Sequence, residues 1–118
     1  MDDLGAPVSH LGVAEGVPVY DRAGRRIGVV DRVIVDEPTG IFEGIVVHTH
    51  PLPGRHLYAA HGQIAELRER GVVLAAEGGE LYELSERAAR ERARRRQTPE
   101  SPLERSLRRA WDWLAGVR

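Results

Sequence analysis

The 118-residue sequence lacks cysteine and lysine, and it contains only one phenylalanine and two tryptophans. The absence of cysteine excludes disulfide bonds, thiolate metal sites and cysteine nucleophiles, and it is compatible with a reducing compartment. No apolar run approaches the roughly 18 residues of a membrane-spanning helix. The acidic start at residues 1–4 lacks the basic and apolar regions of a secretory signal. We therefore expect a cytoplasmic protein.

Charge is distributed unevenly along the chain. All seventeen basic residues are arginine, and the net charge is −6 over residues 1–84 but +5 over residues 85–118. Because periodicity and turn content also change near Ser85, we place a boundary there. The expected units are a flexible N-terminus over 1–10, a β domain over 11–84, an Arg-rich helix or spacer over 85–97, and a linker with an amphipathic helix over 98–118.

Short segments rich in β-branched residues, separated by turn signals, predict a mainly β domain. The expected strands cover residues 17–20, 27–35, 41–49, 56–60, 72–76 and 81–84. Residues 62–70 are predicted to form one short helix with Ile64 and Leu67 facing inward. Apolar residues change phase within 27–35, which predicts a bulge near Asp31 and Arg32. Six short strands in so few residues favour a small barrel or a two-sheet roll.

Turns and apolar positions follow one another in a characteristic pattern along this β region: Gly16-Val17-Pro18-Val19-Tyr20-Asp21, Gly24, Ile27-Gly28-x-Val30-Asp31-x-Val33-x-Val35-Asp36, Ile41-x-x-Gly44-Ile45-Val46-Val47, Pro53-Gly54-Arg55 and Gln63-Ile64-x-Glu66-Leu67. This pattern resembles the PRC-barrel family, which takes its name from the photosynthetic reaction centre H subunit and includes the C-terminal domain of the ribosome maturation factor RimM. The resemblance covers roughly residues 11–84 and ends before the Arg-rich region. His61 departs from the pattern, where a proline or a small residue is expected.

The resemblance implies a six-stranded PRC-like barrel with one short helix, here followed by a helical C-terminal extension. It also implies a non-catalytic adaptor, since relatives dock onto a ribosomal protein or onto photosynthetic complexes. Gly24 and Gly28 would be turn and close-packing glycines, and Asp21 and Asp36 would accept hydrogen bonds in turns. The family supplies no catalytic residue to carry over.

Four histidines, His48, His50, His56 and His61, form the one cluster with potential chemistry. His48 and His50 are two residues apart and would share a face of one strand, which is a spacing used in zinc and iron sites. His56 would face them from the next strand, and Glu43 or His61 would supply a further ligand. A zinc or other divalent metal site, a pH-sensitive surface patch and an inert barrel rim are the three interpretations, of which the inert rim is favoured.

Signatures of catalysis are absent from the sequence. No serine lies in a Gly-x-Ser-x-Gly context, and there is neither a Gly-x-Gly-x-x-Gly motif nor a P-loop lysine to bind nucleotide phosphates. The carboxylates Asp31, Asp36, Glu37 and Glu43 are better explained as a solvated exterior than as an acid–base pair. We therefore expect a protein that is not an enzyme and has no resident cofactor.

The Arg-rich segment 85–97 begins at a potential N-cap, Ser85, but has only alanine as its apolar residues, so it cannot pack deeply. It is a solvated spacer or an arm that contacts phosphates. The spacer is favoured because no aromatic residue is interleaved for base stacking. The candidate nucleic-acid contacts, for RNA in particular, are Arg87, Arg90, Arg94, Arg95 and Arg96.

A capping box, Ser101-Pro102-Leu103-Glu104, opens the last helix. At about 100° per residue, one apolar stripe forms, flanked by Trp111 and Trp113, with the polar residues Arg105, Arg108, Arg109 and Asp112 on the far face. The stripe consists of Leu103, Leu107, Ala110, Leu114 and Val117. It would fold back on its own barrel, pair with a copy of itself in a homo-oligomer, enter a partner's groove, or lie on an anionic membrane as a peripheral contact.

The sequence thus indicates a protein-interaction module whose C-terminal helix is the docking or oligomerisation element. The candidate partner-binding residues are Leu103, Leu107, Trp111, Trp113 and Leu114. Aromatic and large aliphatic anchors dominate binding energy at interfaces, and the arginine face would control the association rate and its salt dependence.

Overall fold

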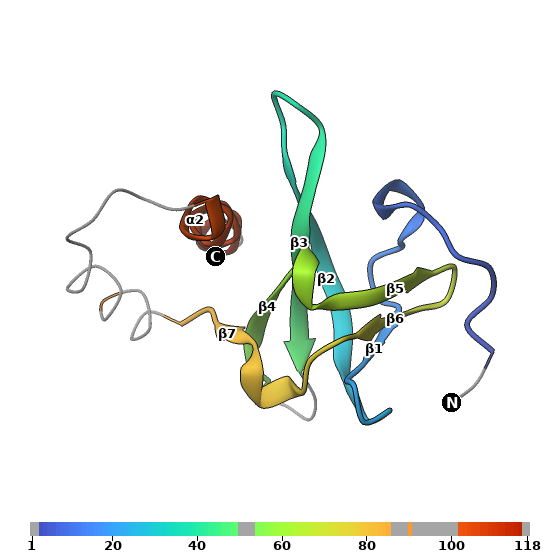
Figure 1. Ribbon diagram of the computed structural model, residues 1–118. Coiled ribbons are helices and arrows are strands. Elements are labelled where there is room, and N and C mark those ends of the chain that lie inside the picture. Colours follow the sequence, from blue (N-terminus) through green and yellow to red (C-terminus); the bar gives the residue numbers. More distant parts are fainter. Residues whose placement is uncertain (1–2, 50–53, 86–89, 91–101, 117–118) are drawn as a thin grey trace.

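The computed structural model describes residues 3–49, 54–85, 90 and 102–116. Seven strands form a single sheet in the order β5-β6-β1-β2-β3-β4-β7, and a helix, α2, packs on one side of it (Figure 1). All described pairings are antiparallel except that of β1 with β6. The strands are β1 (Pro18–Tyr20), β2 (Arg26–Asp36), β3 (Ile41–Thr49), β4 (His56–Ala60), β5 (Ile64–Arg68), β6 (Gly71–Leu74) and β7 (Tyr82–Glu83). Three short 3-10 turns complete the set: η1 (His10–Gly12), η2 (His61–Gln63) and η3 (Gly78–Glu80).

The long β2–β3 hairpin is the centre of the sheet, and its turn follows from the sequence. The Asp36 carbonyl accepts a hydrogen bond from the Gly40 N–H at 2.6 Å, and the Asp36 carboxylate accepts one from the Thr39 hydroxyl at 3.0 Å. The predicted bulge near Asp31 is confirmed, because the register with β3 shifts between Val30 and Arg32. Such a bulge lets one strand present apolar residues to both faces of the sheet.

The turn between β1 and β2 also confirms the roles given to its residues. The Asp21 carboxylate accepts hydrogen bonds from the backbone N–H groups of Ala23 at 3.0 Å and Arg25 at 2.9 Å. Gly24 has a φ of +83°, a conformation that L-residues with a side chain rarely adopt. At Gly28, a Cβ atom would collide with the His48 carbonyl of β3. The two glycines are therefore a turn residue and a close-packing residue, as expected.

The helix predicted over residues 62–70 is wrong: after the η2 turn, the chain forms strand β5. Ile64 and Leu67 do face the core, as predicted. They share a face because the register with β6 shifts between Ile64 and Glu66, so Ala65 is an extra residue that changes the alternation. A bulged strand and a helical turn both place residues i and i+3 on one side, which is why the pattern suggested a helix.

The fold class is mainly β, as predicted, but the sheet has seven strands rather than six and it is not closed. The extra strand is β5. Backbone groups of the N-terminal segment pair with the outer edge of this strand, with Val8 N–H donating to Leu67 at 3.0 Å and a bridge between Pro7 and Arg68. The edge is thereby protected from pairing with another chain.

Two separate apolar clusters lie on the two faces of the sheet. The larger, which we call the inner core, is made only of aliphatic residues: Val13, Val19, Val30, Ile45, Val47, Leu57, Ala59, Val72, Leu74, Ala76 and Leu81. The second, which we call the helix interface, joins the outer face of β2, β3 and β4 to α2: Ile34, Val46, Tyr58, Leu84, Leu107 and Ala110. Alternate residues of β3 point to opposite faces, so Ile45 and Val47 belong to the first cluster and Val46 to the second.

Helix α2 (Pro102–Ala115) begins at the proline that the capping box places at its first position. In Figure 1 it lies beside β3 and β4, on the opposite side of the sheet's centre from β5 and β6. Its place on its own sheet answers a question left open by the sequence, where folding back was one of four alternatives. Most of the segment predicted as an Arg-rich helix over 85–97 lies outside the described residues.

Candidate functional site

The apolar stripe of α2 is buried against the outer face of the sheet. Leu107 is 2 % exposed and Ala110 is fully buried, and they pack with Ile34, Val46 and Tyr58. Leu103, Trp111, Trp113 and Leu114 are partly buried around them. Four of the five candidate partner-binding residues therefore surround Leu107, the fifth, in one contiguous surface. In this structure that surface is occupied by the protein's own sheet.

A buried hydroxyl pair lies at the centre of this interface. The Tyr58 hydroxyl of β4 is hydrogen-bonded to the Ser106 hydroxyl of α2, and the two residues are 0 % and 5 % exposed. Burial raises the pKa of Tyr58 to about 12, although the hydrogen bond with Ser106 works against the rise, and the nearby Glu43 carboxylate adds to it. The neutral phenol is therefore the form that the docked helix favours.

An ion-pair network lies beside the hydroxyl pair. The Arg109 guanidinium donates a hydrogen bond to the Glu43 carboxylate of β3, and it lies 3.5 Å from the Asp36 carboxylate of β2. The hydrogen bond to Glu43 raises the pKa of Arg109, although burial opposes the rise. Arg109 therefore stays protonated across the accessible pH range and connects the helix to two strands.

Three residues of this site were not identified from the sequence: Tyr58 of β4 and, on α2, Ser106 and Arg109. The assignment of Arg109 to the solvent face is wrong, because its side chain turns back to two carboxylates at the rim of the interface. The missed signal was helical spacing: Ser106 is three residues after Leu103 and four before Ala110, so it belongs to the buried stripe. A serine in that stripe requires a polar partner across the interface.

Two polar atoms at this interface have no hydrogen-bond partner among the described residues: the second carboxylate oxygen of Glu43 and the indole nitrogen of Trp111. A buried polar atom without a partner costs roughly 1–3 kcal/mol. These two unpaired atoms make the docking of the helix less favourable. The Tyr58–Ser106 and Arg109–Glu43 contacts specify its position. At the helix's C-terminal end, the Arg32 guanidinium lies over the Trp113 ring at 5.6 Å.

Of the candidate nucleic-acid residues, only Arg90 lies within the described part of the chain, where it is helical and exposed. Arg87, Arg94, Arg95 and Arg96 lie outside it. RNA binding by this segment stays a prediction.

The structure brings together two of the four candidate metal-ligating histidines. His48 and His56 are cross-strand neighbours with rings stacked at 4.8 Å, and His56 Nε2 lies 3.0 Å from an Asp31 carboxylate oxygen. Parallel stacked rings direct their nitrogens to the ring edges rather than toward one common point. His61 lies at the other end of β4, and His50 lies outside the described residues. Within the described residues, no group of three His, Asp or Glu side chains could hold a metal ion.

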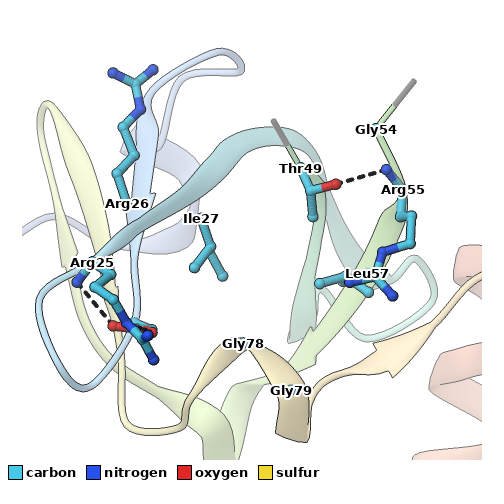
Figure 2. Close-up of a pocket in the computed structure, with 10 residues that line it drawn as sticks. Arg25, Arg26, Ile27, Thr49, Gly54, Arg55, Leu57, Gly78 and Gly79 are labelled. Atoms are coloured by element: carbon cyan, nitrogen blue, oxygen red, sulfur yellow. Dashed lines mark hydrogen bonds and ion pairs between the residues drawn. The ribbon is translucent and has the colours of Figure 1, made fainter. Parts of the chain in front are cut away.

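A second surface feature is a pocket of about 580 Å³ at the end of the sheet where the β1–β2 turn and the start of β4 approach η3. Figure 2 shows Arg25 and Arg55 on opposite sides of Ile27, while Arg26 rises from the rim and points away from the floor. Asp21 also lines the pocket but is 1 % exposed. Burial alone would raise the pKa of Asp21, but the hydrogen bond from the Arg25 N–H and the Arg25 charge outweigh it, so the pKa is lowered.

None of the helices in the described regions is long and apolar enough to cross a bilayer. No curated protein matches the chain. The family model of the PRC-barrel domain matches residues 15–81, which is more than half of the sequence and includes β1 to β6. Domains of this kind are often protein-interaction modules and are generally non-catalytic. With its turn residues, bulged hairpin and single sheet, the chain belongs to the PRC-barrel domain family.

Proposed function

We propose that this protein is a non-catalytic cytoplasmic interaction module whose outer sheet face, formed by β2, β3 and β4, binds an amphipathic helix. In the isolated chain the bound helix is α2. In the functional assembly α2 is the docking or oligomerisation element, and it is exchanged between copies or placed on a partner. The observation that carries this proposal is the seating of α2 by Leu107, by the Tyr58–Ser106 pair and by the Arg109–Glu43 pair.

The polar contacts support a specific docking site rather than a non-specific apolar contact. Sliding α2 by one turn would separate Ser106 from Tyr58 and Arg109 from Glu43, leaving buried polar groups unpaired. The cost of such unpaired groups fixes the register of the helix on the sheet. A helix from another chain would be accepted only if it presented serine and arginine at the same spacing.

The way in which α2 is attached to the rest of the chain supports the proposal that it can be released from the sheet. Among the described residues, no backbone hydrogen bond joins α2 to the sheet. The helix is held by the apolar cluster and by the Tyr58–Ser106 and Arg109–Glu43 side-chain pairs. Sixteen residues, 86–101, separate Ser85 from Pro102. Fully extended, a segment of that length spans roughly 50 Å, which exceeds the longest dimension of the described structure, 44 Å. Exchange of a terminal element between identical chains is a low-cost route to a dimer.

A peripheral membrane contact is compatible with this proposal only in the released state. While α2 is docked, Leu107 and Ala110 face the sheet and are not accessible to lipid.

The test uses reciprocal charge reversal at the Arg109–Glu43 pair. In Glu43→Arg, the new arginine repels Arg109, and in Arg109→Glu, the new glutamate repels Glu43, so each variant alone should release its helix. When the two variants are mixed, the helix of each chain finds a complementary charge on the sheet of the other. We expect the single variants to be monomers of 13.1 kDa and the mixture to contain a dimer, measured by light scattering after size exclusion.

Two controls make the result specific. The double variant E43R/R109E restores complementarity within one chain, so it should be a monomer in which tryptophan fluorescence returns to the native spectrum. Arg105→Glu reverses a charge at an exposed position of the same helix and should form no dimer with Glu43→Arg. A mixture that stays monomeric would refute exchange. A labelled peptide of residues 98–118 that also fails to bind the Arg109→Glu chain would refute the docking face itself.

A further inference from the structure

A second binding site, independent of α2, is indicated by the arginine-rimmed pocket of Figure 2. We propose that this pocket binds an acidic peptide segment of a protein partner, with carboxylates held by Arg26 and Arg55 and an aliphatic side chain placed on the floor. The proposal goes beyond the function proposed above, because none of the lining residues belongs to the helix interface.

The pairing of the arginines is the first observation. Residues 1–84 carry seven arginines within an acidic region, and five of them have a partner. Four are in ion pairs, namely Arg22 with Glu77, Arg25 with Asp21, Arg68 with Glu66 and Arg70 with Asp3, and Arg32 lies over Trp113. The guanidinium groups of the other two, Arg26 and Arg55, have no ion pair within the described part of the chain. Both line this pocket.

The second observation is that the carboxylate in the lining cannot neutralise these two charges. Asp21 is buried, and its oxygens accept hydrogen bonds from its own turn and pair with Arg25 at 3.3 Å. Its lowered pKa keeps it charged, but that charge is directed at Arg25 and the turn backbone. Arg26 and Arg55 therefore present positive charge to whatever enters from solvent.

The third observation is the chemistry of the floor. Ile27 and Leu57 lie between the arginines, and Leu57 is 4 % exposed because it belongs to the inner core. On the opposite wall, Gly78 and Gly79 have no side chains to fill the space, and a Cβ at Gly79 would meet nothing within 4 Å. A volume of about 580 Å³ lies within the range of ligand pockets and holds one or two side chains.

These features together favour an acidic peptide over a nucleic acid or a free anion. Guanidinium groups bind carboxylates through paired charge-assisted hydrogen bonds. None of the described residues that line the pocket has an aromatic ring on which a base could stack. A free inorganic anion would leave the apolar floor unused, whereas an acidic segment with a leucine uses the rim and the floor at once.

The test is an NMR titration of the full-length ¹⁵N-labelled protein with the blocked pentapeptide EDLED, to millimolar concentration. We expect saturable shifts of the backbone signals of Ile27, Arg55, Gly78 and Gly79. The amide peptide QNLQN, which lacks the charges, and EDSED, which lacks the aliphatic side chain, should each bind at least tenfold more weakly. Because the rim arginines are exposed, the variant R26E/R55E should fold normally and lose at least tenfold in affinity for EDLED.

The matched control is Arg70→Glu, a single charge reversal at the other end of β6 from Gly78, which should keep the native affinity within a factor of two. Equal binding of QNLQN or of EDSED, or unchanged binding of EDLED by R26E/R55E, would overturn the proposal. An oligouridylate that shifts the same four signals at lower concentration than EDLED would assign the pocket to nucleic acid and also overturn it.

Discussion

The two faces of the sheet are closed in different ways. The inner core is closed by strands and turns that follow one another within residues 13–81, and its buried members are all aliphatic. The outer face is closed by a helix that begins at Pro102, after a long connection. Its contacts include one tyrosine–serine pair and one arginine–glutamate pair. One face holds the domain together, and the other specifies which helix lies on it and in which register.

This difference follows from the physical chemistry of the two surfaces. Burial of aliphatic side chains is favourable but non-directional, so it stabilises a fold without selecting a partner. Buried polar groups contribute little net free energy when paired, but they are costly when unpaired. A docking face therefore gains selectivity from Tyr58 and Glu43 that an aliphatic surface would lack.

The largest expected effect separates the two faces directly. Ile45→Ala removes a fully buried side chain from the inner core, and Leu107→Ala removes one from the helix interface. Each change should cost about 2–5 kcal/mol. Ile45→Ala lowers the free energy of unfolding of the sheet, whereas Leu107→Ala lowers the free energy of docking of the helix. Both tryptophans lie on α2, so tryptophan fluorescence reports the docking of the helix, and the backbone amide NMR signals of β2 and β3 report the sheet.

In urea unfolding, Ile45→Ala should lower both transitions together. Leu107→Ala should lower the fluorescence transition alone and leave the sheet near its native midpoint. If the two probes coincide for Leu107→Ala, then the helix and the sheet unfold as one unit and the distinction between the faces is wrong.

Alkaline pH should weaken the outer face selectively. The pKa of Tyr58 is raised from 10 to about 12 in the folded state. Its contribution to stability is therefore fully present below pH 10 and is lost as the pH rises to 12. A shift of this size corresponds to a loss on the order of 3 kcal/mol. Urea midpoints followed by tryptophan fluorescence should fall between pH 10 and 12, and Tyr58→Phe should flatten this fall. An equal fall in that variant would show that other groups are responsible.

The hydroxyl pair can be dissected by a double-mutant cycle. Ser106→Ala leaves the Tyr58 hydroxyl buried without its partner, which should cost about 1–3 kcal/mol. Tyr58→Phe should cost a similar amount for the converse reason. The combination Y58F/S106A removes both polar groups, so its cost should be clearly smaller than the sum of the single changes. Additive costs, measured by urea unfolding, would show that the two hydroxyls do not interact energetically.

Much of the fold could be predicted from the sequence because its signals are local. The turn chemistry of Asp21 and Gly24, the Asp36 hairpin and the phase change near Asp31 each report on a few neighbouring residues. The start of α2 at Pro102 is equally local. The resemblance to the PRC-barrel family rests on the same positions.

What could not be predicted depends on contacts between distant segments. Ile64 and Leu67 share a face in a helix and in a bulged strand alike, and only pairing with β6 decides between them. Arg109 fits a solvent face by periodicity, and only the position of Glu43, 66 residues earlier, turns it inward. Docking surfaces are by nature non-local, so the sequence indicated an amphipathic helix without indicating where it lies.

The smallest expected effect concerns the rim of the helix interface. Arg32 of β2 lies over the Trp113 ring at 5.6 Å, and exposed cation–π contacts contribute about 0.5–1 kcal/mol. Arg32→Gln should lower the free energy of helix docking, followed by tryptophan fluorescence in urea, by an amount in that range. It should leave the urea midpoint of the β2 and β3 amide NMR signals unchanged, because Arg32 does not belong to the inner core. Arg32→Lys keeps the charge and should lose less. Equal losses in the two variants would show that the contact depends on the planar guanidinium stacking on the Trp113 ring rather than on its positive charge.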